Sequence, residues 1–366
     1  MKKFVYMDAS ASWLKPQSVI ESEGDFLHNS YANAGRGICA RAGHVDALID
    51  AARGKVADFI GADKENIIWT TGTTDSFNRI VNILKNTFQN KNFVVAVSDL
   101  DHHSARLPFE MCDAFKTIIM PLDEDFNIDV KNIPNADVYV ITAMSNVMGI
   151  AQDISAITKS IRNINSNAII IVDAAQFVVH NKVDVKKFDC DFLCFSGHKI
   201  GGDTGLGVMY IKKPDVWTVD KFGGGMVNRV DGTDIILNKS PEKFEAGTLP
   251  ITQIVGLPYA IDYCKNWDGG QDLIHYMYDE LSKIENIKLL TVRDSVMISF
   301  VPQSMHVIDF GAMLGVKGIC VRVGNMCASW IHKKLNIDGS VRISVGPWNT
   351  IDDAKYVVDV IKGLVK

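Results

Sequence analysis

The chain has 366 residues, 47% of them hydrophobic and 22% charged, so it can bury a sizeable core, and its length favours two domains over one. The formal net charge of −5 and the scattered Lys and Arg residues exclude a basic stripe for nucleic acid. An acidic residue, Asp8, interrupts the amino-terminal segment before a signal peptide could form, and nowhere do ~18 uninterrupted apolar residues occur. We therefore expect a cytoplasmic protein that does not contact membranes or nucleic acid directly.

The cysteine content argues against both disulfides and metal sites. Seven cysteines are an odd number without regular spacing, which favours reduced thiols. Cys190 and Cys194 lie four residues apart on a presumed strand, a spacing that suits a buried face better than zinc. We expect no bound metal.

The predicted elements alternate between helices and short apolar strands. A helix is predicted over 45–60, with Gly61 as its stop signal. The remaining elements, in chain order, are a strand at 67–69, a helix at 76–84, strands at 93–97, 138–141, 168–172 and 190–194, and helical stretches at 254–264 and 273–284 followed by short strands. Short apolar runs between helices are typical of a parallel sheet covered on both faces.

This pattern predicts an α/β fold with two domains. Residues 12–258 would form a large domain around a doubly wound, mainly parallel sheet. Residues 259–366 would form a smaller α+β domain together with the amino-terminal segment 1–11.

Polar residues gather where the predicted strands end, and open α/β sheets bind ligands at that edge. Asp173 ends one strand, and an acid there is expensive to ionise unless a cation faces it. Lys199 follows the next strand and could be its partner in a plain ion pair. Alternatively, the carboxylate could hold a protonated pyridine nitrogen while the amine binds an aldehyde, the arrangement that pyridoxal phosphate enzymes use.

A phosphate site is compatible with the residues between the first strand and its helix. Gly72, Thr73 and Thr74 would offer backbone N–H groups and hydroxyls at a helix start, and Ser196 and His198 could add two donors. Taken alone, the Gly-Thr-Thr turn is explained equally well by ordinary helix capping.

Several motifs in this order resemble one enzyme family. They are Tyr6-Met7-Asp8-Ala9-Ser10-Ala11, Gly35-Arg36-Gly37, Asp101-His102-His103, Ser145-Asn146-Val147-Met148-Gly149, Asp173-Ala174-Ala175-Gln176, Phe195-Ser196-Gly197-His198-Lys199 and Phe244-Glu245-Ala246-Gly247-Thr248. Together they resemble the class V aminotransferase family of fold-type I pyridoxal phosphate enzymes over almost the whole chain. Within it, the chain is most similar to the cysteine desulfurase and selenocysteine lyase branch, particularly its group II members.

The resemblance implies pyridoxal 5′-phosphate as cofactor, with a role for each matching residue. Lys199 would bind the cofactor covalently, and Asp173 would hold its pyridine nitrogen. Gln176 would bond the phenolic oxygen, Asn146 would bond that oxygen or the substrate carboxylate, and His102 would stack on the ring. The phosphate would be held by Thr73, Thr74, Ser196, His198 and, from the neighbouring subunit of a homodimer, Thr248. Without this context, a histidine near a strand end is more often an ordinary polar residue than a stacking one.

The branch of the family depends on a cysteine near the carboxyl terminus. Arg322, Gly324 and Cys327 fall at the spacing found in group II desulfurases, which implies that Cys327 accepts sulfur from L-cysteine as a persulfide and that L-alanine is released. Most cysteines are simply buried small side chains, as we expect for Cys320. Arg342, or less favourably Arg322, would bind the substrate carboxylate, although surface ion pairing is the commoner role of arginine.

Two other functions remain open at this point. The chain could be a selenocysteine lyase or another class V enzyme in which Cys327 is not catalytic. It could also be a catalytically silent protein that uses the fold for binding. If it is a desulfurase, a sulfur-acceptor protein is a possible partner.

Overall fold

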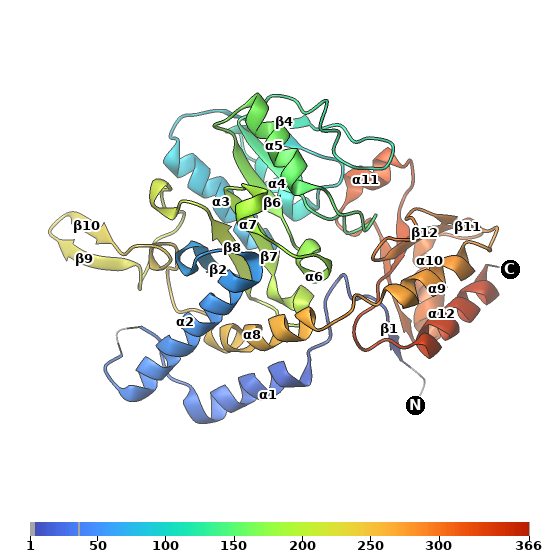
Figure 1. Ribbon diagram of the computed structural model, residues 1–366, viewed down its shortest axis with the longest axis horizontal. Helices are drawn as coiled ribbons and strands as arrows, with labels where there is room; N and C mark the ends of the chain where they lie inside the picture. The colour runs from blue at the N-terminus through green and yellow to red at the C-terminus, as the bar shows by residue number, and fades with distance from the viewer. Residues whose placement is uncertain (1–3, 36, 366) are drawn as a thin grey trace.

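The computed structural model describes residues 4–35 and 37–365 (Figure 1). Arg36 of the Gly-Arg-Gly motif, residues 1–3 of the predicted amino-terminal segment and residue 366 lie outside the described residues. Among those described, no helix is both long enough and apolar enough to cross a bilayer.

A seven-stranded sheet forms the centre of the larger part of the molecule (Figure 1). Its strands, in spatial order, are β2 (Ile67–Thr70), β8 (Gly207–Ile211), β7 (Phe192–Ser196), β6 (Ile169–Asp173), β5 (Val138–Thr142), β3 (Phe93–Val97) and β4 (Phe115–Ile119). Strand β8 runs antiparallel to both of its neighbours, and the other pairs are parallel. The prediction of a large, mainly parallel sheet is therefore confirmed.

Helices cover both faces of this sheet, as doubly wound folds require. Along β6, Ile170 and Val172 belong to one core and Ile169 and Ile171 to the other, because successive side chains of a strand point to opposite faces. The first core is closed by α2 (Ala40–Ile60), α5 (Ile154–Ile164), α6 (Phe177–His180), α7 (Val185–Phe188) and α8 (Ile251–Lys265), with α1 (Gln17–Asp25) packed on α8. The second is closed by α3 (Thr73–Thr87) and α4 (His103–Glu110).

A third core lies around a four-stranded antiparallel sheet. Its strand order is β11 (Ile287–Leu289), β12 (Ile298–Pro302), β15 (Ser340–Ile343) and β14 (Arg322–Gly324), and its apolar residues pack with α9 (Gln271–Leu281), α10 (Val307–Val316) and α12 (Ile351–Leu364). The amino-terminal strand β1 (Val5–Tyr6) pairs in parallel with β13 (Ile319–Cys320), so Val5 and Met7 enter this core.

The change from the core of the large sheet to the core of the four-stranded sheet falls after α8. This helix runs through residue 258, where the sequence analysis placed the domain boundary, and Ala260, Ile261 and Cys264 from its second half still pack in the core of the large sheet. Trp267, just beyond the helix, contacts both cores.

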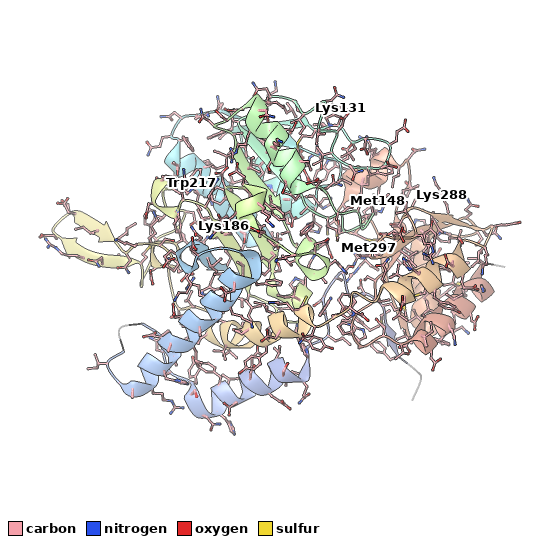
Figure 2. The ribbon with its side chains drawn as sticks, in the orientation of Figure 1. Lys131, Met148, Lys186, Trp217, Lys288 and Met297 are labelled. Carbon is pink, nitrogen blue, oxygen red and sulfur yellow. The ribbon has the colours of Figure 1, made fainter. Side chains whose placement is uncertain are left out.

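The two parts also meet where the loop after β5 contacts β12 and the residues just before it. Figure 2 labels Met148 and Met297 at this junction. The hydroxyl of Ser295 donates to Met148 O at 3.0 Å, and that of Ser299 donates to Val147 O at 2.5 Å. These bonds fix the loop after β5 against the smaller sheet.

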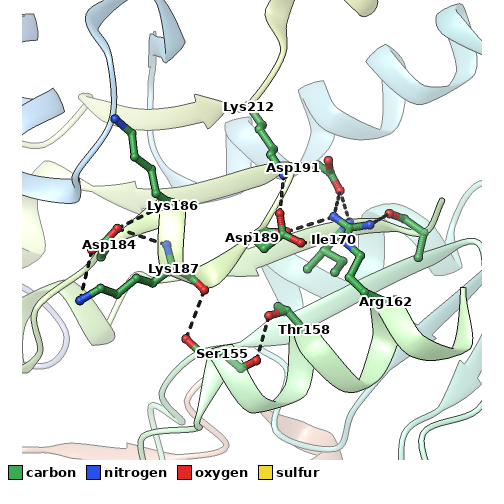
Figure 3. Close-up of polar contacts among 11 residues, drawn as sticks. Ser155, Thr158, Arg162, Ile170, Asp184, Lys186, Lys187, Asp189, Asp191 and Lys212 are labelled. Atoms are coloured by element: carbon green, nitrogen blue, oxygen red, sulfur yellow. Dashed lines mark hydrogen bonds and ion pairs between the residues drawn. The ribbon is translucent and has the colours of Figure 1, made fainter. Parts of the chain in front are cut away.

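Two further features complete the fold. At the far end of the strands from the site described below, Arg162 on α5 pairs with Asp189 and Asp191, each at 3.1 Å, and thereby ties the helix to the start of β7 (Figure 3). A hairpin of β9 (Val227–Asp231) and β10 (Asp234–Leu237), which the sequence analysis did not predict, projects from the large sheet (Figure 1).

Candidate active site

A cavity of about 300 Å³ lies at the carboxyl ends of β5, β6 and β7. Every predicted site residue except Thr248 lines it, although these residues come from segments far apart in the chain. They are Thr73, Thr74, His102, Asn146, Asp173, Gln176, Ser196, His198, Lys199, Arg322, Cys327 and Arg342. The structure brings them together, and their individual roles stay predictions.

Asp173 and Lys199 create opposite charges within this cavity. Asp173 is the last residue of β6, and its Oδ1 accepts a hydrogen bond from Ala175 N at 3.0 Å. Burial raises the pKa of Asp173, an effect opposed by that hydrogen bond and by the charge of Lys199. Burial lowers the pKa of Lys199 from 10.5 to about 8, with a further lowering from Arg342 and an opposing effect from Asp173. Lys199 therefore carries a far larger fraction of neutral, nucleophilic amine at neutral pH than an exposed lysine does.

The amino end of α3 supplies the polar groups on another wall. Thr73 begins the helix and donates through its backbone N to Ser196 Oγ at 2.9 Å, and the two hydroxyl oxygens lie 2.8 Å apart. Gly72, which precedes the helix, has a φ of +148°. Glycine is also required opposite it, because a Cβ at Gly207 would lie 2.4 Å from Gly72 Cα. This close packing sets the first turn of α3 at the cavity.

Four buried polar atoms around the cavity have no hydrogen-bond partner in the described structure. They are Asn146 Oδ1, Gln176 Oε1, His198 Nδ1 and Arg342 Nε. The other amide atoms are satisfied, because Gln176 Nε2 donates to Ser10 O at 2.7 Å and Asn146 Nδ2 donates to Met326 O at 2.9 Å. Since an unpaired buried polar atom is costly, this cluster indicates a site for a polar ligand.

Two arginines form the cationic part of the cavity. Arg342 on β15 is buried, donates through Nη1 to Asn146 O at 2.8 Å and pairs through Nη2 with Asp8 Oδ1 at 3.1 Å. Arg322, its neighbour on β14, is exposed and pairs with the other oxygen of Asp8 at 2.7 Å. Arg342 is thus a buried ion-pair partner, whereas Arg322 pairs at an exposed position.

His102 caps helix α4 with its ring. Its Nδ1 accepts from Ser104 N at 3.1 Å and lies 2.7 Å from Ser104 Oγ. Burial, followed by the nearby charge of Lys199, lowers the pKa of His102 to about 3. The ring is therefore neutral at physiological pH, which suits contact with a flat aromatic ligand.

Cys327 is the exposed thiol of the cavity. It lies in the loop between β14 and α11 (Ser329–Lys334) and lines the cavity, whereas Cys320 is half-buried on β13. Cys39 is also exposed, contrary to the general expectation of burial, but it does not line the cavity. Within the described parts of the chain, no group of three His, Cys, Asp or Glu residues is arranged to hold a metal ion.

Thr248 lies elsewhere, beside Glu245 and Gly225 in a separate hollow on the same chain. Its predicted contribution to the site of a second subunit stays a prediction.

The sequence analysis assigned no role to three residues at this site. Ser10 and Thr142 line the cavity, and Asp8 lies behind it as the partner of both arginines. Asp8 and Ser10 belong to a quoted motif, and Thr142 ends β5, where a polar residue after an apolar run was a usable signal. The hydroxyl of Thr142 donates to the buried carboxylate of Asp101 at 2.7 Å.

The sheet order and the helices on both faces define the fold of fold-type I pyridoxal phosphate enzymes. The chain belongs to the aminotransferase class-V family, whose model matches residues 5–357. It is 30% identical to a cysteine desulfurase of Serratia proteamaculans over 99% of this chain and 93% of that protein, and 31% identical to the cysteine desulfurase CsdA of Escherichia coli over 98% and 93%. The apo structure of a cysteine desulfurase from Thermococcus onnurineus NA1 superposes with a TM-score of 0.93 at 30% identity, covering 99% of this chain and 94% of that one.

Proposed function

We propose that the chain is a pyridoxal phosphate-dependent cysteine desulfurase, which converts L-cysteine to L-alanine and retains the sulfur on Cys327 as a persulfide. The observation that carries this proposal is that Lys199, Asp173 and the exposed thiol of Cys327 line one cavity. The names of the relatives support the same activity.

The cavity residues fit this cofactor. The carboxylate of Asp173 would hold the pyridine nitrogen, Gln176 Oε1 is an unpaired acceptor suited to the phenolic group, and the neutral ring of His102 would cover the face. The phosphate would be held by Thr73, Thr74, Ser196 and His198 at the first turn of α3. When bound, pyridoxal phosphate supplies an electron sink for bonds at the α-carbon of an amino acid.

The protein side chains then have separate tasks. Arg342 orients the substrate carboxylate, for which its buried and unpaired Nε is available. Lys199 removes the α-proton, a role that suits an amine with a pKa of about 8. Asn146 fixes Arg342 through its carbonyl oxygen.

Cys327 performs the sulfur transfer. Its thiolate attacks the substrate sulfur, so an S–S bond forms and the bond between that sulfur and the substrate β-carbon breaks. The electron pair of the broken bond stays with the β-carbon, which takes up a proton, and L-alanine leaves. One sulfur atom has moved from L-cysteine to Cys327, and the thiol proton of Cys327 is balanced by the proton gained at the β-carbon.

Three further properties belong to this proposal: the location of the enzyme, its dimerisation and its sulfur acceptor. The enzyme acts in the cytoplasm. It forms a homodimer in which Thr248 reaches the phosphate site of the partner subunit. A thiol-bearing acceptor protein removes the sulfur from Cys327, which its exposure permits.

The test compares Cys327→Ala with Cys320→Ala in the cofactor-loaded enzyme. We expect alanine formation from L-cysteine to be lost in the first variant and retained in the second, and a persulfide on Cys327 to be detected by alkylation and mass spectrometry in the wild type. Full alanine formation by Cys327→Ala would instead support a selenocysteine lyase or another class V reaction. A protein that never develops the visible absorbance of a bound cofactor would contradict every enzymatic interpretation.

A further inference from the structure

The loop that carries Cys327 has an unfavourable backbone conformation. Met326 and Cys327 have φ values of +50° and +54°, and two consecutive side-chain-bearing residues rarely occupy the left-handed region. Within the loop, Ala328 N donates to Asn325 O at 2.8 Å. This bond closes the turn from within, and contacts from outside the loop add to it.

Those contacts hold two successive carbonyl groups. Met326 O accepts from the side chain of Asn146 at 2.9 Å, and Cys327 O accepts from the backbone N of His103 at 2.7 Å. His103 is the first residue of α4, where a backbone N–H has no partner within the helix and is free to bond elsewhere.

The ring of His103 makes a second attachment just beyond the cysteine. Its Nε2 lies 3.1 Å from Ser329 Oγ and accepts from Ser329 N at 3.4 Å. It also packs edge-on against Trp330, with ring centroids 5.1 Å apart, while the guanidinium of Arg106 lies 4.1 Å from the Trp330 ring centre. Burial lowers the pKa of His103, which keeps Nε2 available as an acceptor.

We propose that His103 is a positioning residue for sulfur transfer: its backbone N–H and its ring hold the loop in the left-handed conformation that presents Cys327 to the cavity. This inference rests on the proposed function. His103 does not line the main cavity, unlike its neighbour His102, but it lines an adjoining hollow together with Cys327. It therefore acts on the main cavity through the loop.

The backbone and ring contributions can be separated with two variants. His103→Ala removes the ring and keeps the N–H group. His103→Pro removes both and places its own ring against Cys327 O. Proline is tolerated at the first position of a helix, and the preceding residue, His102, already has the extended φ of −68° and ψ of 150° that proline requires.

Two reactions distinguish loop positioning from cofactor chemistry. Exchange of the α-proton of L-alanine with deuterium uses Lys199 but not Cys327. Single-turnover formation of the persulfide needs both. We expect near-normal exchange in both variants, a fall in the persulfide rate of about tenfold for His103→Ala from the lost side-chain bond, and a fall of about 100-fold for His103→Pro from the displaced thiol.

A readout that needs no cofactor comes from hydrogen–deuterium exchange of the backbone. In His103→Pro, amides of residues 325–329 should lose protection while the core strands keep theirs. His306→Ala is the control for the loss of a histidine ring, because His306 caps α10 away from the cavity and should change neither reaction.

Several outcomes would overturn the inference. Wild-type persulfide rates in His103→Pro would do so, as would unchanged protection of the loop. If His103→Pro fails to fold, the decision rests on His103→Ala and Ser329→Ala: non-additive losses support a shared contact, and additive losses contradict it. Absence of the persulfide in the wild type would instead refute the proposed function.

Discussion

Arg342 and Asp8 form an ion pair at 3.1 Å between β15 and the amino-terminal segment, and both side chains are buried. Asp8 also pairs with Arg322, so one carboxylate offsets part of the charge of two guanidinium groups. The remaining positive charge matches a single substrate carboxylate. The pair also orients Arg342, because its Nη1 reaches Asn146 O while Nε stays unpaired.

Replacing Arg342 by lysine should therefore weaken substrate binding. A lysine ammonium cannot contact Asp8, the Asn146 carbonyl and a substrate carboxylate with fixed geometry, so we expect KM for L-cysteine to rise about tenfold with a smaller change in kcat. Arg322→Lys, at an exposed position, should change KM about twofold or less. Steady-state kinetics of both variants test this role of Arg342 in substrate binding. An unaltered KM in Arg342→Lys would contradict it.

The lowered pKa of Lys199 predicts a pH-dependent stability of the protein without cofactor. The folded state has a pKa of about 8 and the unfolded chain about 10.5, so the unfolded chain binds more protons between these values and stability rises with pH across that window. Below pH 8 the full cost of burying the charge is present. Lys199→Met should then increase the free energy of unfolding by about 1–2 kcal/mol at pH 7, with a smaller gain at pH 10.

Thermal melts of the cofactor-free proteins at the two pH values measure this effect. Lys182→Met, at an exposed site, is the control. A gain that is equal at both pH values would show that lost charge burial is not its cause.

The buried ion pair of Glu245 with Arg53 leads to a prediction about stability that does not depend on pH. Both of its oxygens accept from Arg53 at 2.9 Å, and one also accepts from Trp69 N at 2.8 Å, all in a buried setting. Glu245→Gln leaves the Arg53 charge without its partner and should lower the free energy of unfolding by about 3 kcal/mol. Asp50→Asn, which breaks the exposed pair with Lys64, should change it by less than about 1 kcal/mol. Equal effects in denaturant titrations would refute this explanation.

Glu23 should make the protein less stable as the pH rises through neutrality. Burial, reinforced by Asp203 and opposed by Lys15, raises its pKa from 4.5 to about 7, and its Oε1 has no hydrogen-bond partner in the described structure. The folded state therefore binds more protons than the unfolded chain between pH 4.5 and 7, and stability contributed by the protonated form is lost across that range.

Glu23→Gln should remove this dependence. We expect the variant to be about 1 kcal/mol more stable than the wild type at pH 8 and nearly equal to it at pH 4.5, by chemical denaturation. Parallel pH profiles for the two proteins would count against the half-buried carboxyl group of Glu23 as the source.

The sequence predicted those elements whose pattern is local. The apolar run at 93–97 coincides with β3 because all its residues are apolar and the residues that flank it, Asn92 and Ser98, are polar. The predicted helix at 76–84 is longer in the structure, where α3 begins at Thr73, because the polar residues of its first turn face the cavity and carry no apolar periodicity. The antiparallel direction of β8 was not predictable, since strand composition is the same in either direction.

The site likewise combines residues that a local sequence pattern predicts with contacts that only tertiary packing creates. Asp173 was recognisable because it directly follows an apolar run, and Lys199 because it lies shortly after the next run; both belong to motifs. The partner of Arg342 was not, because Asp8 is 334 residues away and joins it only once β1 has paired with β13. The left-handed loop at Cys327 and its attachment to His103 likewise result from tertiary packing.

The pairing of the chain's two ends has a consequence for biosynthesis. Val5 and Asp8 leave the ribosome long before their neighbours, since Val5 pairs with Ile319 and Asp8 forms an ion pair with Arg342. A nascent polypeptide that already contains Lys199 and Asp173 therefore still lacks its carboxylate-binding corner. Productive loading with cysteine becomes feasible only after translation has delivered β15.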